Sequence, residues 1–246
     1  MLEGLYSAAS GLAAQQNRLD AVANDLANAS TTGYKPVRVA YADLAYAAPT
    51  TGGQGDVQTG AGAVARFAGR DARQGALQPT GRPLDVALQG PGFLRVRRPD
   101  GTDALTRDGA LQLDAQGRLT TASGDLVQPA VTAPAGVGAD QLSVASDGSV
   151  SANGRPLGRI ELVDVPNPDG LVALGGSLFG PSAASGAVRP APAGTTLAGG
   201  HLEASAVDLA GSMTAMMEAQ RAFQLVSKAI STRDEVWGIA NGVKRA

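Results

Sequence analysis

The sequence predicts an α+β protein in which long N- and C-terminal helices of coiled-coil type flank a central antiparallel β domain. Three observations across the 246 residues predict this fold. Apolar residues recur every seven positions near each end of the chain, which is the spacing of a helix that packs along one side. The middle of the chain has no helical period. Short β-type runs alternate there with Asp-Gly and Asn-Gly turn signals.

The first helix is expected over residues 2–32. Its apolar positions follow a heptad spacing, which we interpret as an assembly interface formed by Leu5, Leu12, Leu19, Val22 and Leu26. Gly33 is expected to stop the helix, because glycine readily adopts the left-handed conformation that follows a helix end.

The last helix is expected over residues 206–246, where Ser205 and Asp208 resemble a capping box. Its heptad stripe belongs to the same expected interface and consists of Leu209, Met213, Met216, Phe223, Ile230 and Trp237. A second stripe beside it consists of Ala219, Ala222, Val226, Ala229, Val236 and Ala240. Two stripes favour packing between subunits, although an antiparallel helix pair within one monomer stays open.

The expected organisation is discontinuous. Residues 1–32 and 206–246 form a terminal helical assembly domain, residues 33–76 a linker or extended arm, and residues 77–205 a β domain of sandwich or open-barrel type. The expected strands include β-type runs at residues 84–88, 93–96 and 159–163. Residues 47–65 are rich in glycine, threonine and alanine with little periodicity, so they are placed in the arm.

The composition excludes several classes of function. A formal net charge of −2 gives no long-range attraction to nucleic acid or to an anionic membrane. The chain has no cysteine, which excludes disulfides, thiolate metal sites and a cysteine nucleophile. The single histidine, His201, and the aspartates beside glycine fit turns better than catalysis. We therefore expect no catalytic residue, metal site or cofactor, and neither a cleaved signal nor a membrane-embedded segment.

Three motifs, in order along the chain, carry a resemblance to a known family. Residues 26–35 read LANASTTGYK, residues 82–93 read RPLDVALQGPGF, and residues 217–223 read MEAQRAF. The sequence therefore resembles the flagellar rod and hook family of axial proteins over nearly its whole length. The family motif is carried by Asn28, Thr31, Gly33, Tyr34, Gln220 and Arg221.

The resemblance implies a structural subunit rather than an enzyme. The implied role is in the bacterial flagellar basal-body rod, most similar to its distal-rod members, where subunits self-assemble into a helical tube that transmits torque from motor to hook. A proximal-rod or other hook-basal-body paralogue is the alternative. The implied partners are further copies of the chain as a homo-oligomer, other rod and hook proteins, ring proteins and the flagellar export apparatus, which would carry the chain to the periplasmic side.

Two other classes of protein fit less well. A carbohydrate-active enzyme needs a pocket with two well-placed carboxylates, whereas this sequence offers turn aspartates. An adhesin stalk would be one continuous coiled coil, whereas the two helices here come from opposite ends of the chain.

Overall fold

The computed structural model describes residues 3–44, 46–47 and 59–243 and divides the chain into two compact units. The helical unit comprises residues 1–27, 37–68 and 208–246, and the β unit comprises residues 28–36 and 69–207. The chain therefore passes from one unit to the other repeatedly, near residues 27, 36, 68 and 207. Part of the predicted arm, residues 48–58, lies outside the described residues.

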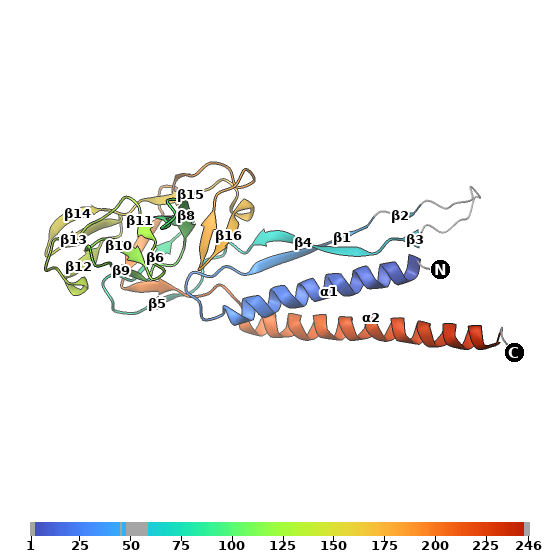
Figure 1. Cartoon of the computed structure of the whole chain (residues 1–246). Helices are drawn as coiled ribbons and strands as arrows, with labels where there is room; N and C mark the ends of the chain where they lie inside the picture. The colour runs from blue at the N-terminus through green and yellow to red at the C-terminus, as the bar shows by residue number, and fades with distance from the viewer. Residues whose placement is uncertain (1–2, 45, 48–58, 244–246) are drawn as a thin grey trace. The chain divides into compact units, whose positions relative to one another are not determined.

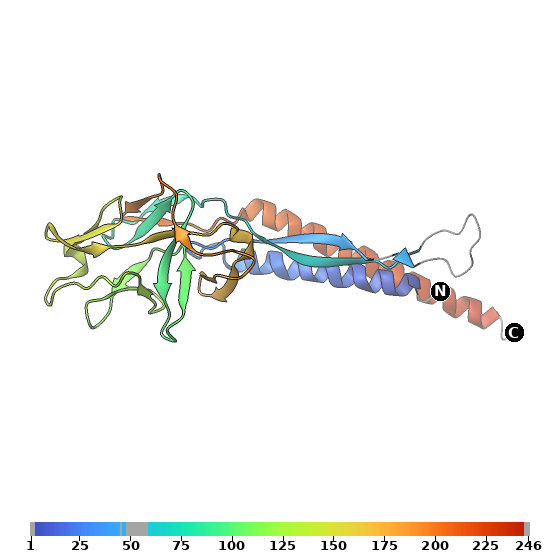
Figure 2. The same ribbon diagram turned by 90° about the horizontal axis from the view of Figure 1, so that it is seen from above.

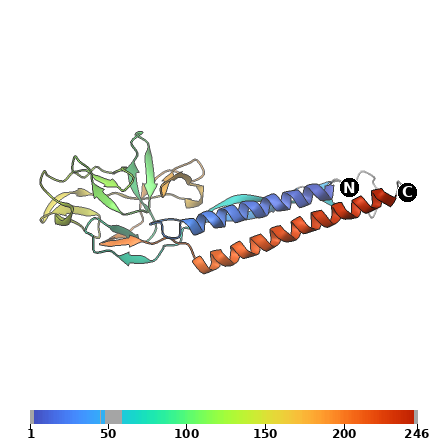
Figure 3. The same cartoon turned by 60° about the horizontal axis from the view of Figure 1, so that its bottom comes forward.

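Two helices and a strand ribbon make up the helical unit. Its elements are α1 (Glu3–Ala27), β1 (Val37–Asp43), β2 (Tyr46–Ala47), β3 (Thr59–Gly60), most of β4 (Ala63–Arg70) and α2 (Leu209–Val243). The last two residues of β4, Gly69 and Arg70, belong to the β unit. The helices lie side by side and run in opposite directions (Figures 1 and 3). β1 pairs with β4, and the ribbon lies along α1 (Figure 2). Within the described ranges, neither helix is long and apolar enough to cross a membrane.

The first helix ends at Ala27, earlier than predicted. Asn28 and Thr31 close a turn instead, since the Thr31 N–H donates to the Asn28 carbonyl and the Thr31 hydroxyl donates to Asn28 Oδ1, both at 3.1 Å. Asparagine and threonine side chains compete with helical hydrogen bonds in this way. Gly33 does adopt the left-handed conformation, with φ +63°, but it lies beyond this turn and does not cap the helix.

The second helix begins at Leu209, later than predicted. Asp208 caps it, because its Oδ1 accepts a hydrogen bond from the Ala210 N–H at 3.1 Å. The predicted capping box is wrong, because the Ser205 hydroxyl accepts from the Val207 N–H at 3.4 Å rather than from the first turn of the helix. The 35 residues of α2 make a helix about 52 Å long.

The β unit is built from short strands. They are β5 (Leu77–Pro79), β6 (Val86–Gln89), β7 (Phe93–Arg97), β8 (Asp103–Thr106), β9 (Leu111–Leu113), β10 (Leu119–Thr121), β11 (Leu126–Val127), β12 (Leu142–Val144), β13 (Ser149–Ala152), β14 (Arg155–Arg159), β15 (Leu162–Asp164), β16 (Val172–Gly175), β17 (Leu178–Gly180), β18 (Arg189–Pro190), β19 (Thr196–Gly199) and β20 (His201–Glu203). Short 3-10 turns lie at Ala139–Gln141 and Pro168–Gly170.

The strand pairs of this unit are antiparallel, which confirms the predicted central antiparallel β region. The largest sheet has the order β16-β17-β8-β7-β11-β10-β9, and β15 pairs with both β7 and β18. Three further sheets have the orders β12-β13-β14, β19-β6 and β20-β5. Asn153 and Gly154, with φ 49° and 78°, make the predicted hairpin turn between β13 and β14.

The predicted strand at residues 159–163 is divided. Arg159 ends β14 and Leu162 begins β15, because the chain leaves the three-stranded sheet here and enters the largest one. Between them, the Ile160 N–H donates to the Gly148 carbonyl at 2.8 Å, and the Ile160 side chain is buried. A sequence run of β-forming residues does not mark such a change of sheet.

The β unit has its own apolar core. Its main cluster of buried residues is Leu84, Val86, Leu88, Leu94, Val96, Ala104, Leu111, Leu119, Val127, Val131, Ala133, Leu142, Val150, Ala152, Ile160, Leu178 and Leu197. A second cluster contains Phe93 and Phe179, whose rings meet edge to face at 5.9 Å. All the buried residues of both clusters belong to the β unit, so its apolar core is formed by its own side chains.

The close backbone approach at Gly109 gives a test of this packing. A Cβ atom at Gly109 would lie 1.6 Å from the Val86 carbonyl oxygen. We predict that Gly109→Ala lowers the free energy of unfolding of the β unit by about 3 kcal/mol, the upper end for an overpacked site. Gly101→Ala is the control, because its Cβ would meet open space and only the strain of φ +84° remains, about 1 kcal/mol. Equal losses in urea unfolding of the two variants would contradict the described packing.

Candidate assembly site

The described side chains of the first predicted stripe are partly covered within the helical unit. Leu12, Leu19, Val22 and Leu26 are half-buried, and the side chain of Leu5 lies outside the described part of the chain. On the ribbon side of α1, the Ala63 N–H donates to the Ser10 hydroxyl at 3.3 Å. On the α2 side, Arg18 forms an ion pair with Glu218 at 3.3 Å. Helix α1 is therefore held between the ribbon and α2.

Small side chains form the side of α2 that is covered within the subunit. Ala219 is fully buried, and Ala215, Ala222 and Val226 are half-buried. These residues recur at helical spacing along one face, and α2 packs against α1, so this face is the one that meets α1. It includes the first half of the second stripe from the sequence.

Several large apolar side chains of α2 are exposed to solvent. Within the predicted interface Leu209, Met213, Phe223 and Trp237 are exposed, whereas Met216 and Ile230 are half-buried. Another set, Leu225, Val236 and Ile239, is also exposed, with Leu225 at 72% and Ile239 at 68%. At about 100° per residue, the two sets flank the alanine face on opposite sides. The motif residues Gln220 and Arg221 are exposed on the same helix.

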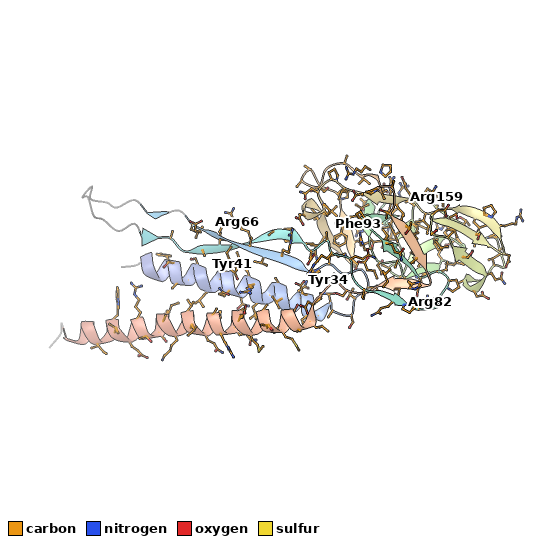
Figure 4. All side chains as sticks on the ribbon, turned by 180° about the vertical axis from the view of Figure 1, so that it is seen from behind. Tyr34, Tyr41, Arg66, Arg82, Phe93 and Arg159 are labelled. Carbon is orange, nitrogen blue, oxygen red and sulfur yellow. The ribbon has the colours of Figure 1, made fainter. Side chains whose placement is uncertain are left out.

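Apolar side chains exposed on more than one face of a helix are typical of an interaction surface. The ribbon carries exposed side chains of its own, such as Tyr41 on β1 and Arg66 on β4 (Figure 4). The open faces of α2 are therefore candidate surfaces for packing against further helices.

The N-terminal family motif serves a different purpose from the helix stripes, because it lies in the β unit. Gly33 approaches the backbone so closely that a Cβ atom there would lie 2.6 Å from the Arg107 carbonyl carbon. Tyr34 is buried, and the Arg70 guanidinium lies over its ring at 5.9 Å. The Gly33 N–H donates to the Glu203 carbonyl at 2.9 Å, and the Ala206 N–H donates to the Tyr34 carbonyl at 3.1 Å.

Three buried charged side chains, Lys35, Arg107 and Glu203, form what we term the anchor cluster. Glu203 Oε1 accepts from Lys35 Nζ at 2.7 Å and from the Gly75 N–H at 2.9 Å, and its Oε2 accepts from Arg107 at 3.1 Å. Arg107 also donates to the Gly90 carbonyl at 2.8 Å. The cluster thereby joins the segment that follows α1 to the strand that precedes α2.

Burial controls the electrostatics of the anchor cluster. Loss of hydration lowers the pKa of Lys35 from its ordinary value, while the hydrogen bond and the charge of Glu203 act in the opposite direction. Each member of the cluster therefore depends on its partners, since a lone buried charge is strongly disfavoured.

The sequence reasoning missed Arg107 and Glu203 as functional positions. Lys35 and Glu203 are separated by 168 residues, so no local spacing links them. The available signal was the occurrence of single charges inside β-type segments, at Leu105-Thr106-Arg107 and at Leu202-Glu203. Such charges are rarely buried unless they are paired.

Three sequence models of known families match the chain. The model described as "Flagella basal body rod protein" matches residues 5–35. Those described as "Flagellar hook protein FlgE/F/G D1 domain" and "Flagellar basal body rod FlgEFG protein C-terminal" match residues 87–152 and 198–243. The matches thus include α1, much of the β unit and α2.

Named relatives resemble the chain over nearly its full length. The flagellar basal-body rod protein FlgG of Borreliella burgdorferi is 38% identical over 100% of both chains. FlgG of Bacillus subtilis is 38% identical over 96% of this chain and 97% of its own. The flagellar basal-body rod protein FlgF of Escherichia coli is 31% identical over 98% of each.

The anchor cluster is tested by removing its negative charge without changing its shape. We predict that Glu203→Gln lowers the free energy of unfolding by about 3–5 kcal/mol, because Lys35 and Arg107 then stay buried without a counter-charge. Asp103→Asn is the matched control, since Asp103 pairs with Arg95 and Arg97 at a partly exposed site worth about 0–1 kcal/mol. Calorimetry that gave both variants the same melting temperature would rule out a stabilising anchor cluster.

Proposed function

The chain belongs to the family of flagellar basal-body rod proteins, and from this premise we propose how its surfaces build the rod. It is a structural subunit of the rod and is located in the flagellar basal body. The family is one of structural proteins rather than enzymes. The main support for the proposal is that large apolar side chains are exposed on two faces of α2.

We assign the chain to the distal-rod type. The similarity to FlgG proteins supports this subtype, with identities from 34% to 38% to relatives in several bacteria. The similarity to FlgF of Escherichia coli is 31% and keeps a proximal-rod or other paralogue as the second candidate.

Assembly proceeds by burial of the exposed α2 faces against further copies of the chain. Burial of a leucine, phenylalanine or methionine side chain contributes about 1.5–3 kcal/mol. The two open sets on α2, one with Phe223 and the other with Leu225, then contact different neighbours. Heptad spacing makes coiled-coil-type packing between such helices the natural geometry. Repetition of one contact that does not close into a ring produces a helical tube.

Other rod and hook components contact the same surfaces at the ends of the tube, while ring proteins and the export apparatus are the remaining proposed partners. Torque passes along the tube through the repeated helix contacts. Within each subunit, the segments next to the crossings between units are bound together by the anchor cluster. A twisting load on a subunit is therefore resisted by a buried network rather than by single strands.

The role of the open α2 face is tested at Leu225, which is 72% exposed. We predict that Leu225→Asp abolishes swimming in a strain that lacks its own copy, because an unpaired carboxylate would be buried at every subunit contact. The melting temperature of the purified monomer should stay within about 2 °C of the original, as for other surface substitutions.

Gln224→Asp provides the control, because it places the same charge on the neighbouring exposed residue. It should support swimming to a much greater extent than Leu225→Asp. Full swimming by Leu225→Asp would show that this face is not buried in the rod. A melting temperature lowered by many degrees would show instead that Leu225 is packed within one subunit.

A further inference from the structure

A small cavity of about 70 Å³ lies in the β unit beside the anchor cluster. Three cationic side chains line it: Lys35, Arg70 and Arg107. The rings of Phe93 and Phe179 form part of the wall. Figure 4 labels Phe93, one of the residues that line the cavity.

The charges around this cavity do not balance. Glu203 is the carboxylate that bonds to both Lys35 and Arg107. The two carboxylates that line the cavity itself have arginines of their own, Asp71 with Arg73 at 2.5 Å and Asp164 with Arg189 at 2.9 Å. Within the described part of the chain, Arg70 forms no ion pair.

The Arg70 guanidinium is held in a fixed orientation. It lies over the rings of Tyr34 at 5.9 Å and Phe179 at 5.6 Å, and its Nη1 donates to the Lys35 carbonyl at 2.7 Å. Its Nε is buried and has no hydrogen-bond acceptor among the described residues. Aromatic faces stabilise a cation but do not accept an in-plane N–H. A buried charged donor without an acceptor is costly, so the geometry calls for a further acceptor.

We propose that this cavity binds one carboxylate group through Arg70. A carboxylate is planar and accepts two parallel N–H bonds from an arginine edge, and Arg70 Nε is the N–H without an acceptor, whereas Nη1 already donates to the Lys35 carbonyl. The volume suits a group of a few heavy atoms. One negative charge would offset the unpaired Arg70 and reduce the excess of cations over Glu203. The carboxylate comes either from a small free acid or from an acidic side chain of a neighbouring copy.

Sodium formate is the probe, and thermal unfolding of the full-length monomer is the readout, which is independent of rod assembly. Formate should raise the melting temperature in a saturable manner by about 2–4 °C relative to sodium chloride at the same ionic strength. Arg70→Met should remove the effect, and Arg70→Lys, which keeps the charge but not the planar edge, should weaken formate binding at least about tenfold. Arg66→Met is the matched control, because it removes an exposed arginine from the same strand and should leave the effect unchanged.

An equal shift with chloride, or no saturable shift with formate, would overturn the proposal and leave water as the partner of Nε. Retention of the full formate effect in Arg70→Lys would overturn it as well, even if Arg70→Met failed to fold. Swimming separates the two sources of the carboxylate. Normal swimming of Arg70→Lys, with formate binding weakened, indicates a free acid, whereas lost swimming with an unchanged monomer indicates a side chain of a neighbouring copy. Both results support the site.

Discussion

The buried hydrogen bonds and ion pairs of the Glu203 carboxylate are the interactions on which the rest of the β unit depends. They hold together the segment that follows α1 and the strand that precedes α2. It accepts hydrogen bonds from Lys35, Gly75 and Arg107 at 2.7–3.1 Å, and all three charged side chains are buried. Lys35 lies in the short segment between α1 and β1, and Glu203 lies in the strand that leads to α2. Because a buried charge without its partner is strongly disfavoured, these two distant segments are fixed together.

Backbone hydrogen bonds extend this constraint around the same point. Gly33 and Tyr34 bond to Glu203 and Ala206, and the Asp71 N–H donates to the Pro36 carbonyl at 2.9 Å. The left-handed Gly33 allows the segment to lie against Arg107 without a side chain in the way. The motif that resembles the N-terminal signature of rod proteins is therefore explained by docking of the chain inside the β unit. It does not extend the helix stripe.

The sequence predicted the elements whose evidence is local and missed those whose evidence is distant. The heptads located both helices, and Asn153-Gly154 located a hairpin, since helical period and turn chemistry are properties of neighbouring residues. The helix ends were misplaced because Asn28 and Asp208 act through their own side-chain hydrogen bonds. The anchor cluster could not be predicted, because its partners meet only through the sheet topology. The assignment of the stripes to contacts between subunits stays a prediction.

The distribution of side-chain sizes separates the two units energetically. Leucines, valines and an isoleucine fill the core of the β unit, whereas the buried apolar residues among the described helical side chains are Ala14 and Ala219. Alanine faces let α1 and α2 approach closely but bury little apolar area, so their pairing contributes little free energy by itself. The larger side chains, such as Phe223 and Leu225, are exposed, and their burial is assigned to subunit contacts only in the proposed rod. Because anything that binds only the folded form stabilises it, subunit contacts in the proposed rod would add to the free energy of unfolding of the helical unit.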